Sequence, residues 1–100
     1  MDTAVVIDEF VAVHKDIQAD LGYASASVSP STCPLTDLQG FDSPLIPNAV
    51  RLVAQRLGLK LPKGTRIPNI YVSTDGTRKL TVAEIAERFK ILAGAGVSVA

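Results

Sequence analysis

The chain has 100 residues, ten acidic and ten basic side chains, and 47% apolar residues. This is enough for one small hydrophobic core and indicates a single domain. With five aromatic residues, no Trp and one Cys, we expect a core of Val, Leu, Ile and Ala, and no intrachain disulfide. No signal peptide is seen, and no run approaches the ~18 apolar residues of a membrane span. We therefore expect a soluble, cytoplasmic protein with no membrane span.

The charges are distributed unevenly along the chain. Residues 1–42 contain seven acids against one base, Lys15, whereas residues 43–74 contain five bases and no acid. Poles of opposite sign favour steering of a charged partner or an electrostatically matched docking face. They do not indicate bulk affinity for nucleic acid.

The N-terminal segment, about Thr3 to Leu21, has the apolar spacing of an amphipathic helix. Asp2 or Thr3 can cap this helix and Gly22 can end it. The inward stripe consists of Val6, Phe10, Val13, Ile17 and Leu21. The only histidine, His14, lies beside this stripe.

The next segment, Tyr23 to Leu38, is rich in Ser, Ala, Thr and Pro and is predicted to be a long loop. Loops of this length are uncommon in compact domains, which is a weak indication of function. Leu35 and Leu38 are expected to anchor it to the core.

A second helix is predicted from about Ile46 to Leu57, with Gly58 ending it. Its inward residues are expected to be Ala49, Leu52, Val53 and Leu57, and its outward residues Arg51, Gln55 and Arg56. In the connector that follows, residues 70–72 have strand character and Asp75-Gly76 is a turn signal. A small hairpin and a short irregular turn are both compatible with residues 70–80.

The last helix is predicted to open at Thr81, which with Glu84 forms a capping box. Its apolar stripe consists of Val82, Ile85, Phe89 and Leu92, and Gly94 ends it. Residues 1–93 would form the domain and residues 94–100 a flexible tail. Three helices joined by long loops predict a small all-α bundle.

Ser43 stands immediately before the second helix. Pro44 disfavours the α region for the residue before it and itself suits the first helical position. Ser43 therefore fits an N-cap, with Asp42 adding favourable negative charge near the helix start. Pro47, at the fourth helical position, would lose a hydrogen bond, so the alternative is a regular helix that starts nearer Pro47 and leaves Ser43 on an extended turn.

The segment Leu35 to Ser43 (LTDLQGFDS) resembles the prosthetic-group attachment loop of acyl carrier proteins. Residues 57–62 (LGLKLP) are similar to the end of that family's second helix and its following loop. Residues 80–86 (LTVAEIA) are similar to the opening of its fourth helix. The order of these motifs matches the family across roughly residues 4–92. The resemblance implies a four-helix carrier-protein bundle whose third helix is degenerate here.

The resemblance also implies a function without catalysis. Ser43 would carry 4′-phosphopantetheine, and Asp42 would support its attachment by a phosphopantetheinyl transferase. The thiol of the arm would hold an acyl or aminoacyl group as a thioester for partner enzymes. A phosphate ester at a helix start would also lie near unpaired backbone N–H groups.

The chain departs from the family where partners dock. Pro44 replaces the usual leucine, Pro47 follows, and Arg51 and Arg56 make a normally acidic helix basic. The expected docking residues are Pro44, Leu45, Arg51 and Arg56. They favour loading and transfer enzymes with acidic docking patches, in a specialised biosynthetic pathway.

Other functions were weighed against the carrier hypothesis. An unmodified interaction module, in which Ser43 only caps a helix, is the main alternative. A hydrolase built on Ser43 and His14 lacks a glycine-rich oxyanion loop, and one Cys with one His cannot form a metal site. A nucleic-acid reader using Arg51 and Arg56 lacks net positive charge and an aromatic platform.

Overall fold

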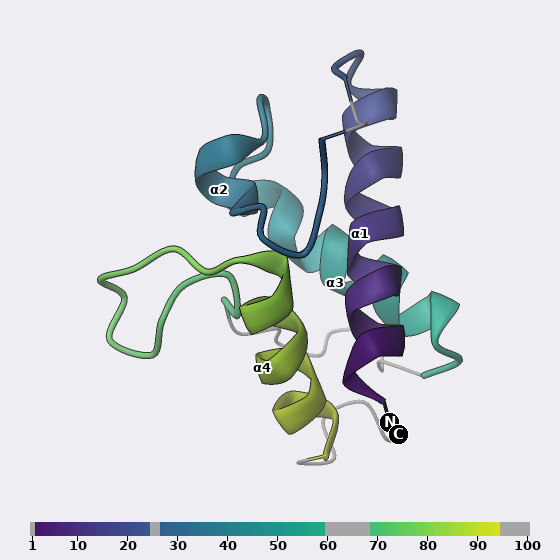
Figure 1. The fold of residues 1–100 in the computed structure, drawn as a ribbon, viewed down its shortest axis with the longest axis vertical. Helices are drawn as coiled ribbons and strands as arrows, with labels where there is room; N and C mark the ends of the chain where they lie inside the picture. The colour runs from purple at the N-terminus through teal and green to yellow at the C-terminus, as the bar shows by residue number, and fades with distance from the viewer. Residues whose placement is uncertain (1, 25–26, 60–68, 95–100) are drawn as a thin grey trace.

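The computed structural model describes residues 2–24, 27–59 and 69–94 (Figure 1). The elements in chain order are α1 (Thr3–Asp20), α2 (Pro34–Asp37), the 3-10 turn η1 (Ser43–Leu45), α3 (Ile46–Arg56) and α4 (Val82–Gly94). No strand occurs in the described ranges. The predicted all-α class is therefore confirmed, while residues 95–100 of the predicted tail lie outside the described residues.

Both ends of α1 follow from local sequence. At its start, the Asp2 carboxylate accepts a hydrogen bond from the N–H of Ala4, 3.1 Å away. At its end, Gly22 adopts φ +85°, and the N–H of Tyr23 donates to the Gln18 carbonyl at 2.9 Å. A left-handed residue with this bond defines a Schellman motif. The predicted cap and stop are confirmed.

The predicted loop 23–38 contains a short helix, α2, that the sequence analysis missed. Pro34 occupies its first position, where the missing N–H of proline has no cost. The Asp37 carboxylate accepts from the N–H of Cys33 at 2.8 Å. Leu38 is buried and Leu35 is half-buried, so the predicted anchoring of this segment is confirmed.

The inward face of α3 differs from the prediction. Its buried residues are Ile46, Ala49, Val50, Val53 and Ala54. These follow the i, i+3, i+4, i+7, i+8 pattern of an amphipathic helix that begins at Ile46. Leu52 and Leu57, which were predicted to point inward, lie at the edges of this stripe and are half-buried.

The first backbone N–H groups of α4 are hydrogen-bonded by its capping box and by carbonyls of the long loop. The N–H of Glu84 donates to the Thr81 hydroxyl at 3.3 Å, and the Glu84 carboxylate accepts from the N–H of Thr81 at 2.9 Å. The N–H groups of Val82 and Ala83 donate to carbonyls of residues 32 and 30. The capping box is therefore confirmed. The helix start also holds the long loop in place.

The described part of the connector, residues 69–81, contains no helix. An isolated antiparallel bridge joins Val72 and Lys79, and the N–H of Leu80 donates to the Tyr71 carbonyl at 2.9 Å. Arg88 of α4 donates to the Val72 carbonyl and so ties this turn to the bundle. Of the two alternatives left open by the sequence, the described residues have the short irregular turn, closed by a single bridge and without strands.

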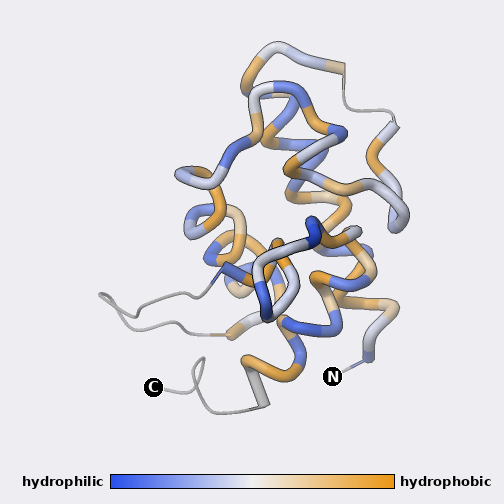
Figure 2. The backbone as a smooth tube through the Cα atoms, turned by 90° about the vertical axis from the view of Figure 1, so that its left-hand side faces the viewer, coloured by the Kyte–Doolittle hydropathy of each residue, from blue (hydrophilic) through white to orange (hydrophobic). Residues whose placement is uncertain are grey.

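The core lies where α1 packs against both α3 and α4. In Figure 1, α1 stands along the long axis with α4 antiparallel beside it, and α3 crosses behind α1. Figure 2 shows hydrophobic and hydrophilic residues alternating along the helices, as amphipathic faces require.

The core consists mainly of Val, Leu, Ile and Ala, as expected, but it also contains four buried aromatic rings. The fully or almost fully buried rings are Phe10, Phe41, Tyr71 and Phe89. The rings of Phe10 and Phe89 meet edge to face, with centroids 5.5 Å apart and planes at 80°. Each buried ring removes a large apolar area from water, so these four residues contribute more to the core than their number suggests.

Candidate functional site

Ser43 lies exposed at the first position of η1. The residue before it, Asp42, is also exposed and has extended backbone angles, φ −140° and ψ 179°. No residue in the described part of the chain forms a hydrogen bond with the Ser43 hydroxyl. The hydroxyl is therefore accessible to an external reactant.

Ser43 does not cap a helix, and of the two helix starts that the prolines left open the structure has the later one. The α-helix begins three residues later, and the N-cap residue of η1 is Asp42, whose side chain makes no capping bond. Pro44 and Pro47 both lack an N–H, and the chain forms a 3-10 turn before the α-helix. This correction removes the structural role that the sequence had assigned to the serine.

The 3-10 turn also reduces the number of unpaired backbone N–H groups that were expected next to Ser43. The N–H of Leu45 donates to the Asp42 carbonyl at 3.0 Å, and the N–H of Ile46 donates to the Ser43 carbonyl. Pro44 has no N–H to offer. The start of α3 therefore provides little of the anion site typical of helix N-termini.

The loop before Ser43 is held by contacts on three sides. Phe41 is buried, with its ring centroid 5.1 Å from that of His14 and 5.5 Å from that of Tyr71. Gly40 has φ +75° and lies under the Tyr23 ring. Gln18 of α1 donates its side-chain amide to the Gln39 carbonyl at 3.0 Å. These anchors hold the segment that leads to Ser43.

His14 belongs to the core beneath this loop. A ring nitrogen, Nδ1, lies 2.7 Å from the Phe10 carbonyl, which can only accept, so Nδ1 carries the proton. Nε2 then accepts from the Tyr71 hydroxyl at 2.8 Å. Burial lowers the pKa of His14, partly opposed by the bond to Phe10, and burial raises the pKa of Tyr71 well above its ordinary value. Both ring nitrogens are engaged, and neither contacts Ser43.

The four predicted docking residues differ in accessibility. Pro44 and Arg56 are exposed, while Leu45 and Arg51 are half-buried. The Arg56 guanidinium pairs with Glu9 of α1 and lies 4.0 Å from the Asp16 carboxylate. The sequence contained no pattern that predicts this ion pairing between α3 and α1. It partly neutralises the positive charge that was assigned to docking.

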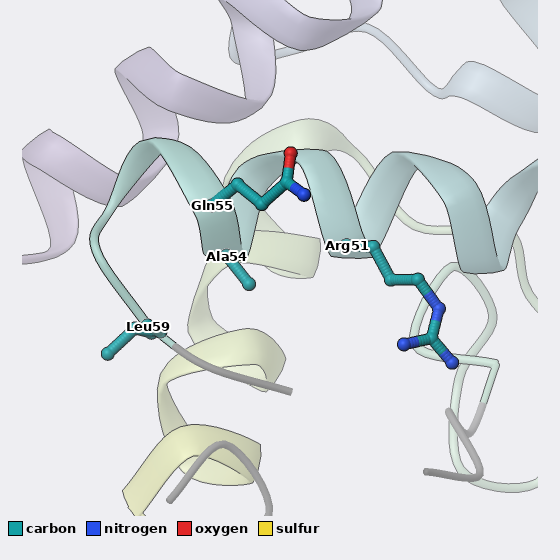
Figure 3. A pocket seen from close by; sticks show the side chains of 4 residues that line it. All are labelled: Arg51, Ala54, Gln55 and Leu59. Atoms are coloured by element: carbon teal, nitrogen blue, oxygen red, sulfur yellow. The ribbon is translucent and has the colours of Figure 1, made fainter. Parts of the chain in front are cut away.

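A hollow of about 80 Å³ lies beside α3, lined by Arg51, Ala54, Gln55 and Leu59 (Figure 3). Pockets for small molecules usually occupy about 300–1,000 Å³. The hollow is therefore too small for a drug-sized ligand.

The described residues provide neither a metal site nor a membrane-spanning helix. The described residues contain no group of three or more His, Cys, Asp or Glu side chains placed to hold a metal ion. Among the helices described, none is both long enough and apolar enough to cross a bilayer. Cys33 is half-buried and forms no disulfide.

The conformation of Gly40 gives a direct test of the loop geometry. In Gly40→Ala the new Cβ would lie 2.6 Å from a Tyr23 ring carbon, and the positive φ would strain any side chain. We expect a loss of about 1–2 kcal/mol in the free energy of unfolding from the backbone, together with displacement of the Tyr23 ring. Chemical denaturation and the ring NMR signals measure these two effects.

Gly76→Ala is the matched control for this variant. Gly76 has φ +76°, but nothing lies within 4 Å of a Cβ built there. It should show the backbone cost alone and leave the Tyr23 signals unchanged. Unchanged Tyr23 signals in Gly40→Ala would contradict the described packing.

No protein-family model, curated protein or solved structure matches this chain. The function is therefore argued from the residues and geometry of the site.

Proposed function

We propose that this protein is a carrier whose Ser43 holds a 4′-phosphopantetheine arm bearing an acyl or aminoacyl thioester. The proposal is supported by one observation above all. Ser43 is exposed and its hydroxyl bonds no described residue, while Gln39 and Phe41 of the preceding loop are held by residues of the core. A reactive group presented on a rigid support suits modification by another enzyme.

Attachment of phosphopantetheine requires only a nucleophilic hydroxyl from this chain, because the transferase supplies the base. The Ser43 oxygen forms a bond to the phosphorus next to pantetheine in coenzyme A, the pyrophosphate P–O bond breaks, and adenosine 3′,5′-bisphosphate leaves. The hydroxyl proton passes to a base of the transferase. Asp42, the exposed residue before Ser43, would help to hold the transferase's divalent cation through its carboxylate. Once bound, the arm supplies the thiol that carries the cargo.

The residues around Ser43 would also serve partner docking. Pro44 presents an exposed apolar ring next to the attachment point, and Leu45 follows it. Arg51 and Arg56 on α3 would meet acidic patches on the loading and transfer enzymes, although Arg56 shares its charge with Glu9 and Asp16. We propose dedicated partners in a specialised biosynthetic pathway on this basis.

The test is the intact mass after co-expression with a broad-specificity phosphopantetheinyl transferase. We expect a gain of one phosphopantetheine group in the wild-type chain and complete loss of this gain in Ser43→Ala. Ser31→Ala replaces another exposed serine and should keep the gain. No gain with several transferases, or a gain that survives Ser43→Ala, would contradict the proposal.

An unmodified interaction module is the second candidate. The bonded N–H groups after Ser43 favour it, because a phosphate ester finds little backbone support there. Ser43 would have no capping role in such a module, so its binding would depend on the α3 face with Arg51 and Arg56. The mass experiment separates the two candidates.

A further inference from the structure

Gln18 is a long polar side chain placed inside the core. It lies one helical turn after His14 on α1 and is only 1% exposed. Its Nε2 donates to the main-chain carbonyl of Gln39, 3.0 Å away and 21 residues later in the sequence. This bond directly ties α1 to the loop that precedes Ser43.

The other end of the same amide is unsatisfied. Gln18 Oε1 is buried and has no hydrogen-bond partner among the described residues. A buried acceptor without a partner lowers stability, whereas an apolar side chain of the same length would avoid that cost. A methionine at position 18 would have a similar length and no unsatisfied acceptor, so stability alone does not favour glutamine. What glutamine adds is the hydrogen bond from its Nε2 to the Gln39 carbonyl.

The loop before Ser43 depends on the bond from Gln18, because few hydrogen bonds within its own backbone hold it. The N–H of Phe41 donates to the Leu38 carbonyl over 3.4 Å, which is a long bond. Gly40 adopts a left-handed conformation between the Gln39 carbonyl and the buried Phe41 ring. Gln18 holds the loop at residue 39, and the buried Phe41 ring holds it two residues further on. Ser43 lies two residues after Phe41.

We infer that Gln18 is a positioning residue for Ser43: its amide holds the Gln39 carbonyl and so fixes the loop that presents the serine hydroxyl. The role in modification rests on the proposed carrier function. The role in ordering the loop does not.

The test is Gln18→Met, which keeps the length of the side chain and removes its N–H donor. We expect global stability in chemical denaturation to be unchanged or higher. The NMR order parameters of residues 39–43 should fall from about 0.85 to below about 0.6. If the transferase modifies the wild-type chain, kcat/KM for that reaction should fall at least tenfold in the variant.

Gln39→Ala is the matched control, because Gln18 contacts the main chain of residue 39 and not its exposed side chain. It should leave loop order and modification unchanged. Lower global stability in Gln18→Met with an unchanged loop would overturn the inference, as would a loosened loop that is modified at the wild-type rate. A loosened loop with no modification of either protein would support the ordering role and contradict the carrier function.

Discussion

Phe41→Ala is expected to lower the free energy of unfolding by about 3–5 kcal/mol, the usual cost of truncating a buried phenylalanine. Phe41 is 4% exposed, and its ring packs against His14 and Tyr71. Small domains have a total stability of about 5–15 kcal/mol, so this loss is a large part of the whole. Thermal and chemical denaturation measure it.

Truncation at Phe41 should also loosen the loop that carries Ser43, since the ring is one of its anchors. Ile91→Ala is the control, because Ile91 is 72% exposed on α4 and its truncation should cost less than about 0.5 kcal/mol. Equal effects of the two substitutions would show that Phe41 does not occupy the core position described.

The second large effect is a loss of stability as the pH falls from 7 toward 5.5. The folded pKa of His14 lies below its ordinary value of 6.5 because the side chain is buried. Below pH 6.5 the unfolded chain therefore binds a proton that the folded chain does not. The free energy of unfolding decreases as the pH decreases. The slope for one group is at most about 1.4 kcal/mol per pH unit. Denaturation midpoints measured across this range provide the test.

Asp75 and Glu84, two exposed acids with lowered pKa values, do not contribute in this window. Hydrogen bonds from Ser73 and Thr77 lower the pKa of Asp75 to about 2, and Arg78 and Thr81 lower that of Glu84 to about 2. Their contributions are complete above their ordinary values near 4 and are lost only in stronger acid. Neither acid therefore accounts for a stability change between pH 7 and 5.5, which is the range expected for His14.

A double variant, His14→Leu with Tyr71→Phe, isolates this effect. It removes both partners of the buried bond, a change that can be nearly neutral for stability because neither partner is left unpaired. The dependence on pH between 7 and 5.5 should disappear. If the double variant keeps the wild-type slope, another group titrates in that range.

Much of the fold could be predicted because its signals are local. The Asp2 cap, the Gly22 stop and the Thr81–Glu84 capping box involve residues at most five positions apart, and each is present in the structure. The start of α3 was harder to predict, because Pro44 and Pro47 allowed two starting points. The structure has a 3-10 turn at Ser43 and an α-helix from Ile46.

The candidate site was only partly predictable. Ser43 and Asp42 were selected by their resemblance to an attachment loop, and their exposure is compatible with that role. The residues that hold the loop, Gln18 and His14, gave no comparable signal. His14 was noted as lying beside the apolar stripe, and Gln18 was not singled out.

The sequence by itself determined the three long helices and most of their buried faces, because hydrogen bonding and amphipathic spacing act within a few residues. Only the tertiary structure decided that His14 bonds Tyr71 across 57 positions, that Gln18 reaches Gln39 and that Arg56 pairs with Glu9. Such pairings depend on how the helices approach one another. Spacing within one segment carries no information about the partner that a polar side chain will meet in another.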